Sequence, residues 1–294
     1  MKKLTIFFWM AILLAICANG LWAQMSDKRT LVAPQFAVGW EGTPRQPGST
    51  QYVTDIQIVA NSFASGKDIL FSFVKSDGGP MIVDLVGPGG ARITNVSNET
   101  ISVQGHTSGG ATVTVCTSCG SQSTQVGAII FLVPYTWSPG SYNYDDDVAI
   151  TVVYRRLDWQ GNEMASAGVD IKPFMTKFTV PVIITPKVDT GFAIYNPSSG
   201  TATLTLNLFN TWRSSGDPAS PLSTAKITLK PNEQQALFFS QAFKNVKSDV
   251  NDNMASNGHV EITSDVAIAV TALKCFFPSN GAFIFAGIPI FPLK

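Results

Sequence analysis

The sequence predicts an all-β protein built from two tandem antiparallel β-sandwiches, with a short helix in the second. Apolar and polar residues alternate in many short segments, and this period of two is typical of strands with one buried and one wet face. The 24 glycines and 17 prolines fall mostly between these segments, where turns need them. Several segments also occur twice in the same order, which indicates an internal duplication.

The alternating segments give the expected strands. In the first half they cover residues 55–59, 68–74, 100–103, 111–115 and 148–154. In the second half they cover residues 203–209, 226–229, 259–263 and 266–270. The one expected helix covers residues 237–246, after the turn at residues 230–233.

The duplication sets the expected domains. Residues 54–62 resemble 190–198, residues 127–131 resemble 258–262, and the best pair is 147–152 with 265–270. Two units of about 120 residues with about seven short strands each are typical of immunoglobulin-like sandwiches. A closed barrel is the alternative, because alternation does not distinguish the two. We expect a signal peptide at residues 1–23 and a first sandwich at residues 30–160. A linker at residues 161–172, where alternation lapses, then leads to a second sandwich at residues 173–294.

The first residues have the three parts of a secretory signal peptide. Lys2 and Lys3 are basic, residues 4–16 are apolar, and Ala23 is a small residue at the expected cleavage site, with Gly20 as the alternative. The apolar run is shorter than the ~20 residues that span a bilayer. An uncleaved anchor and lipidation at Cys17 are the other interpretations. We therefore expect an exported protein, periplasmic, cell-surface or extracellular, with no membrane span in the mature chain.

Charge and composition exclude several classes of function. The chain has 20 basic and 20 acidic residues, which argues against a nucleic-acid partner, since phosphate binding needs a basic surplus. An apolar fraction of 45% and a charged fraction of 14% argue against a disordered chain. The two histidines leave little material for a zinc enzyme or a histidine-based triad.

Cys116 and Cys119 are spaced for a small disulfide loop. They follow an alternating segment and precede a polar loop, whereas a redox-active pair normally lies at a helix N-terminus. In an oxidising compartment a structural disulfide is therefore expected, with Cys275 left over. Unpaired thiols, and redox or metal chemistry, are the alternatives.

The second half also resembles a known group of repeats. The stretches 191–198, 229–239 and 258–272 resemble immunoglobulin-like repeats of secreted and cell-surface proteins from acidobacteria and related bacteria. The resemblance covers about residues 175–294 well and the first half loosely. It implies an extracellular β-sandwich module and brings no catalytic residues with it.

Asp145, Asp146 and Asp147 are the densest charge cluster and a candidate calcium site, because Ca²⁺ takes oxygen ligands from loops. A solvated turn before the next strand is the alternative. The cluster does not recur in the second unit. No other cofactor is expected.

Aromatic residues in loops are the candidate contacts for a ligand or partner. Tyr135, Trp137, Tyr142 and Tyr144 lie close together in sequence, and three further tryptophans lie beside loops: Trp40, Trp159 and Trp212. Tyrosine and tryptophan pair a large apolar body with a polar group, which suits sugar rings and protein interfaces. The alternative is that they cover the ends of the sandwiches.

No catalytic signature is recognised, so the expected function is not enzymatic. We expect a cell-surface or periplasmic structural or adhesive module, with other surface proteins or glycans as partners. One alternative is a carbohydrate-binding module that uses the loop aromatics. Another is a subunit assembled by β-strand addition through the apolar residues 282–286.

Overall fold

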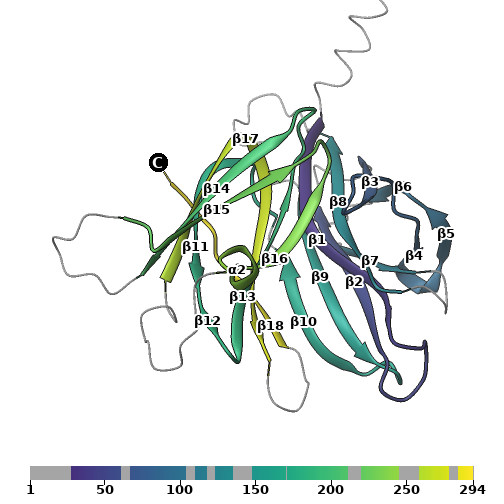
Figure 1. Ribbon diagram of the computed structural model, residues 1–294. Coiled ribbons are helices and arrows are strands. Elements are labelled where there is room, and N and C mark those ends of the chain that lie inside the picture. Colours follow the sequence, from purple (N-terminus) through teal and green to yellow (C-terminus); the bar gives the residue numbers. More distant parts are fainter. Residues whose placement is uncertain are drawn as a thin grey trace, which may run out of the picture.

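Most residues that the structure describes lie in β-strands, so the expected all-β class is confirmed. The structure is a computed structural model that describes residues 28–60, 67–103, 110–117, 123–134, 148–169, 171–210, 220–244, 258–277 and 284–293. Its strands form two sheets (Figure 1). The strands β1 to β10 make up the first unit, and β11 to β19 make up the second unit. Among the described residues, no helix has the length and apolar character of a membrane span.

Each unit is a succession of short and medium strands. The first unit contains β1 (Lys28–Glu41), β2 (Thr50–Ala60), β3 (Lys67–Lys75), β4 (Val83–Val86), the single turn η1 (Pro88–Gly90), β5 (Arg92–Val96), β6 (Asn98–Val103), β7 (Gly110–Cys116), β8 (Gln125–Pro134), β9 (Val148–Asp158) and β10 (Glu163–Val169). The second contains β11 (Met175–Val182), β12 (Ile184–Thr185), β13 (Val188–Tyr195), β14 (Ala202–Asn210), β15 (Ser223–Leu229), β16 (Gln234–Phe238), the single turn α2 (Phe239–Ala242), β17 (Gly258–Phe276), β18 (Ile284–Ile288) and β19 (Phe291–Pro292).

The first unit is one strongly bent sheet with the strand order β5-β4-β7-β2-β1-β8-β3-β6. The strand β1 passes from one half of this sheet to the other. It pairs with β8 along residues 28–38 and with β2 at residues 39–41. The register with β8 shifts between Ala33 and Phe36, where Pro34 has no backbone N–H to donate. The two halves enclose a core of buried aliphatic and aromatic side chains.

This strand order differs from the expected immunoglobulin-like arrangement. An immunoglobulin sandwich holds its third, sixth and seventh strands in one sheet and the other four in the second. In the first unit the strands β1-β8-β3-β6 form one half and β2-β7-β4-β5 the other, which is the arrangement of a jelly roll. Alternation along a strand reports which face is buried and not which strand lies beside it, so the sequence left the order undetermined.

Most of these pairings recur in the second unit. The set β11-β17-β14-β15 corresponds to β1-β8-β3-β6, and the pair β13-β16 corresponds to β2-β7. The long strand β17 takes the place of both β8 and β9. Its residues 258–264 pair with β14, and its residues 269–276 pair with β13. The strand β18 then pairs with the end of β17 as β10 pairs with β9.

Three segments differ from expectation. Residues 163–169, expected in the linker, form β10. In this strand the buried residues Ala165, Ala167 and Val169 alternate with exposed ones. Because alanine is small, this alternation is hard to see in the sequence. In the described part of the expected helix, residues 237–244, only the turn α2 is helical, since Phe238 still pairs with Gly191 in β16. Residues 282–286 were the candidate for pairing between chains in one alternative; of these, 284–286 belong to β18 (Ile284–Ile288), which pairs with β17 of the same chain and lies beside β10.

The two units share buried contacts. Leu273 and Cys275 of β17 pack in the core of the first unit, and Phe285 of β18 meets Tyr154 edge to face at 5.1 Å between ring centroids. The Gln234 side chain donates to the Pro34 carbonyl at 3.1 Å and is almost fully buried. These contacts hold the end of the first unit against the second, as Figure 1 shows where β10 lies beside β18.

Candidate functional site

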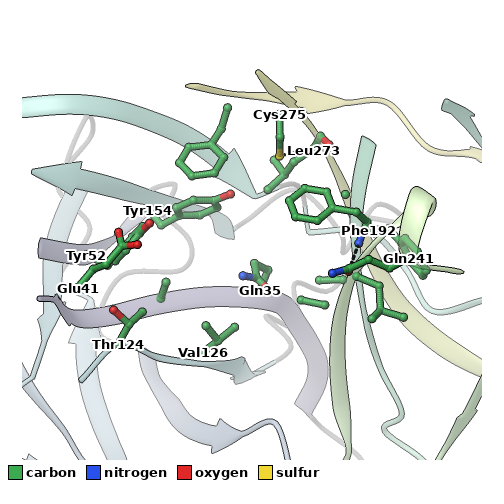
Figure 2. A pocket seen from close by; sticks show the side chains of 17 residues that line it. Gln35, Glu41, Tyr52, Thr124, Val126, Tyr154, Phe192, Gln241, Leu273 and Cys275 are labelled. Carbon is green, nitrogen blue, oxygen red and sulfur yellow. Dashed lines mark hydrogen bonds between the residues drawn. The ribbon is translucent and has the colours of Figure 1, made fainter. Parts of the chain in front are cut away.

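A cavity of about 490 Å³ lies where the first unit meets the second (Figure 2). We call it the junction cavity. Strands of both units supply its walls, from β1, β2, β8 and β9 on one side and β13, β16, β17 and β18 on the other. It is lined by Gln35, Ala37, Glu41, Tyr52, Thr124, Val126, Tyr154, Gly191, Phe192, Ala193, Ala236, Leu237, Phe238, Gln241, Leu273, Cys275 and Phe285. Small-molecule sites commonly have this size and lie at interfaces between such units.

Most of the wall is apolar and aromatic. Tyr154 and Phe192 are each 3% exposed, so their rings are fixed by packing rather than free in solvent. Phe192 is held from behind by Phe239, with the two rings stacked at 4.4 Å between centroids. Figure 2 places Tyr154 and Phe192 on opposite sides of the cavity, with Leu273 and Cys275 along a third side. A ligand body between them would meet carbon atoms from both units.

A polar cluster closes one end of the junction cavity. The Glu41 carboxylate accepts hydrogen bonds from the Thr50 hydroxyl at 3.0 Å and from Arg156 Nη2 at 3.1 Å. Tyr52 lies beside them, with the Arg156 guanidinium carbon 6.0 Å from the centre of its ring. Burial raises the pKa of Tyr52, nearby Arg156 opposes the rise, and Glu41 adds to it. The tyrosine is therefore a neutral hydroxyl at pH 7, able to donate and to accept.

Two further polar atoms near this end have no hydrogen-bond partner among the described residues. They are the hydroxyl oxygen of Thr124, which lines the cavity, and Nη1 of Arg156, and both atoms are fully buried. A buried polar atom without a partner costs free energy, on the order of 1–3 kcal/mol, unless water or a ligand satisfies it. The Thr124 hydroxyl and Arg156 Nη1 therefore add two buried polar atoms to this end of the cavity.

Two further ionisable groups of the wall, Cys275 and Tyr154, are held in their neutral forms. Burial raises the pKa of the Cys275 thiol to about 12, and the carboxylate of Asp189 contributes to the rise. Burial also raises the pKa of Tyr154 well above its usual value. A thiol with such a pKa is protonated at pH 7, and the thiolate is the form that acts as a nucleophile. Cys275 is therefore not a thiolate nucleophile at pH 7.

Most of the predicted site residues lie outside the part of the chain that the structure describes. Tyr135, Trp137, Tyr142 and Tyr144 lie outside the described residues, as do Asp145, Asp146 and Asp147 of the candidate calcium site. Cys116 ends β7, and Cys119 lies outside the described residues, so the disulfide stays a prediction. Within the described part of the chain, no group of three or more His, Cys, Asp or Glu side chains could hold a metal ion.

Sequence reasoning missed the junction cavity itself. Its walls come from residues between Gln35 and Phe285 that are far apart in the chain. In the sequence, Tyr154 and Phe192 are only apolar positions of strand segments. One signal was available: Glu41 and Tyr52 stand on either side of the turn between β1 and β2, but their meeting required the pairing of these two strands.

Comparisons with known proteins add little. No protein-family model and no curated protein sequence matches the chain, so the resemblance of residues 175–294 to bacterial immunoglobulin-like repeats finds no support there. Three solved structures are weakly similar. Thermotoga maritima 1070 is 11% identical over 40% of this chain and 94% of that chain, with a TM-score of 0.29. Hazelnut (Corylus avellana) vicilin is 8% identical over 89% of this chain and 88% of that chain, with a TM-score of 0.21. Brassica napus procruciferin, an 11S globulin, is 9% identical over 84% of this chain and 79% of that chain, with a TM-score of 0.19. All three scores are too low to support a conclusion about fold or function.

Proposed function

We propose that this chain is an exported, non-enzymatic β-sandwich module that binds a small ligand in the junction cavity and acts at the cell surface or in the periplasm. The cavity itself carries the proposal: about 490 Å³ of space between two packed units, with aromatic walls and one polar end. Such a combination of apolar lining and a few placed polar groups is typical of small-molecule sites.

The lining indicates the class of ligand. Rings of Tyr154, Phe192 and Phe285 favour a flat or aliphatic carbon body, and the groups at Glu41, Tyr52 and Thr124 favour a hydrogen-bonding head at one end. We therefore propose an amphiphilic ligand with an apolar body and a polar head. The raised pKa values of Cys275, Tyr154 and Tyr52 support binding over catalysis, because neutral groups in an apolar wall are poor nucleophiles and bases.

We also propose that the two units are copies of one ancestral sandwich. The repeated pairing of strands supports this, and so do the glycines that the sequence aligns. A Cβ on Gly127 of β8 would lie 2.0 Å from the Val74 carbonyl oxygen, and one on Gly258 of β17 would lie 2.3 Å from the Phe209 carbonyl oxygen. Both glycines therefore meet the backbone of a neighbouring strand in the corresponding place. A junction between two copies supplies walls that neither copy has alone.

Export has a direct test. Expression of the full chain in a bacterial host that secretes proteins is expected to give a mature protein whose first residue is Gln24, after cleavage at Ala23. N-terminal sequencing or intact mass of the periplasmic and medium fractions measures this. An uncleaved chain retained in the cell would contradict the proposal of export.

Ligand binding in the junction cavity can be tested with the amphiphilic probe 8-anilinonaphthalene-1-sulfonate, whose fluorescence rises in apolar sites. The folded protein is expected to bind it saturably, and Ala236→Trp, which places an indole in the cavity, is expected to weaken binding at least about tenfold. Ala236 is exposed, so the substitution leaves the core intact.

Ala149→Trp is the matched control, since Ala149 is an exposed alanine of β9 that does not line the cavity. It is expected to bind the probe as the parent protein does. Equal binding by the parent and Ala236→Trp would show that the probe binds elsewhere and would overturn the proposal.

A further inference from the structure

A second hollow of about 380 Å³ lies between the loop joining β1 to β2, the end of β7 and the turn joining β9 to β10. We call it the Trp159 groove. It is lined by Trp40, Arg45, Gln51, Cys116, Thr117, Trp159, Gln160 and Gly161. The junction cavity shares none of these residues.

Trp159 is presented by a firmly built turn. Asp158 Oδ1 accepts hydrogen bonds from the backbone N–H groups of Gln160 and Asn162, each at 2.8 Å, and its Oδ2 accepts one from Asn162 Nδ2 at 2.8 Å. Gly161 has a φ of +91°, a conformation that favours glycine. Trp159 is nevertheless 40% exposed. The turn thus fixes the backbone that carries this partly exposed indole, so that little backbone entropy is lost when a ligand binds.

The floor of the groove contains a second indole and an unsatisfied hydroxyl. Trp40 is 6% exposed and lies opposite Gln51 in the β1–β2 pairing. Thr117 is 2% exposed, and its hydroxyl has no hydrogen-bond partner among the described residues. A hydroxyl so deeply buried is expected to be paired in a functional state. Thr117 lines the groove, so its side chain lies beside any group bound there.

The chemistry of the lining favours one class of ligand. The polar groups are the amides of Gln51 and Gln160, the guanidinium of Arg45 and the Thr117 hydroxyl, and none of the lining residues is acidic. Amides and hydroxyls both donate and accept, which suits neutral hydroxyl groups, while the absence of carboxylates among the lining residues disfavours a cation. A flat aromatic face beside such groups matches the ring of a pyranose, which has C–H bonds on its faces and hydroxyls around its edge.

We propose that the Trp159 groove is a saccharide-binding site, with Trp159 as the stacking platform and Gln51, Gln160, Arg45 and Thr117 as hydrogen-bonding groups to the sugar hydroxyls. This goes beyond the proposed function, because it concerns a separate site on the first unit. The strands β1 and β2 contribute residues to the junction cavity and to the Trp159 groove. Glu41 and Tyr52 line the cavity, while their chain neighbours Trp40 and Gln51 line the groove.

The test is a titration of the mature protein with cellohexaose, laminarihexaose, chitohexaose, xylohexaose and mannohexaose, followed by calorimetry and by tryptophan fluorescence. At least one oligosaccharide is expected to bind saturably at up to millimolar concentration. Trp159→Ala is expected to weaken that binding at least about tenfold, and Trp159→Phe, which keeps a flat ring, is expected to weaken it less.

Two control variants distinguish binding in the groove from binding at another apolar surface or in the junction cavity. Leu222→Ala removes another exposed apolar side chain, 53% exposed and outside the groove, and is expected to bind as the parent does. Ala236→Trp, which fills the junction cavity, is also expected to leave saccharide binding unchanged. The proposal is overturned if none of the five oligosaccharides binds, or if Trp159→Ala binds with unchanged affinity while its circular dichroism spectrum is unaltered.

Discussion

Replacement of Gly127 by alanine is expected to destabilise the protein by more than about 3 kcal/mol and to abolish most of its soluble yield. The added Cβ would lie 2.0 Å from the carbonyl oxygen of Val74 and 2.9 Å from Cε of Met81. The first of these atoms is backbone of β3, which pairs with β8 at this position, so no side-chain rotation relieves the overlap. Either β3 or β8 must move, and the neighbouring ladder bonds are then lost.

Urea unfolding followed by tryptophan fluorescence measures the effect. Gly168→Ala is the matched control, because Gly168 also lies within a strand, yet a Cβ there would meet no atom within 4 Å. It is expected to shift the free energy of unfolding by less than about 0.5 kcal/mol. If Gly127→Ala unfolds at the same urea concentration as Gly168→Ala, the close contact between β3 and β8 is not as described.

Replacement of Asn196 is also expected to lower the stability of the folded protein strongly. This side chain is fully buried after β13, and its Nδ2 faces three carbonyl oxygens: Gly200 at 2.7 Å, Leu229 at 3.2 Å and Lys230 at 3.0 Å. Its Oδ1 accepts from the backbone N–H and the hydroxyl of Ser198. Asn196→Ala leaves these groups without their partner, at a cost of about 3 kcal/mol.

Asn196→Asp makes the stability sensitive to pH. At pH 7 the new carboxylate would face the three carbonyl oxygens, so burial and repulsion would raise its pKa in the folded state above that in the unfolded state. Because the folded state then binds the proton more tightly, the variant is most stable at low pH and loses stability as pH rises through the folded-state pKa. Its stability deficit relative to the parent protein is therefore expected to be larger at pH 7 than at pH 4.

Urea unfolding at both pH values tests this. Asn162→Ala is the control, since Asn162 also makes several hydrogen bonds within a turn but is exposed, and it is expected to cost about 1 kcal/mol or less at either pH. A pH-independent deficit for Asn196→Asp would contradict the orientation of the amide towards the carbonyl oxygens.

Alternation of apolar and polar residues was enough to predict the strands, because each strand needs one buried face whatever its neighbours are. The segments 55–59, 68–74 and 203–209 all lie within observed strands. The same pattern broke down where burial involved small side chains. Ala165 and Ala167 are buried in β10, but alanine carries too little apolar surface to make a strand conspicuous.

The sequence did not predict the pairing of strands or the cavities, for a different reason. The sequence predicts two strands at residues 259–263 and 266–270, whereas β17 runs through both and changes partners midway. The sequence carries no local signal for which strand lies beside which, and the junction cavity depends entirely on that. Trp159 could be picked out as a loop aromatic, but its partnership with Gln51 and Thr117 required three separate segments to be placed together.

The contribution of β17 and β18 to the core of the first unit has a consequence for how the chain folds as it is made. Leu273 and Cys275 are more than a hundred residues later in the chain than most of the first core that they complete. A growing chain that has emerged only to the end of β10 would expose Tyr154 and its neighbours to solvent. Contacts between such distant segments form slowly and leave intermediates prone to aggregation. The first unit should thus reach its final packing only when the last strands have been synthesised, which favours a chain that stays unfolded until it is almost complete.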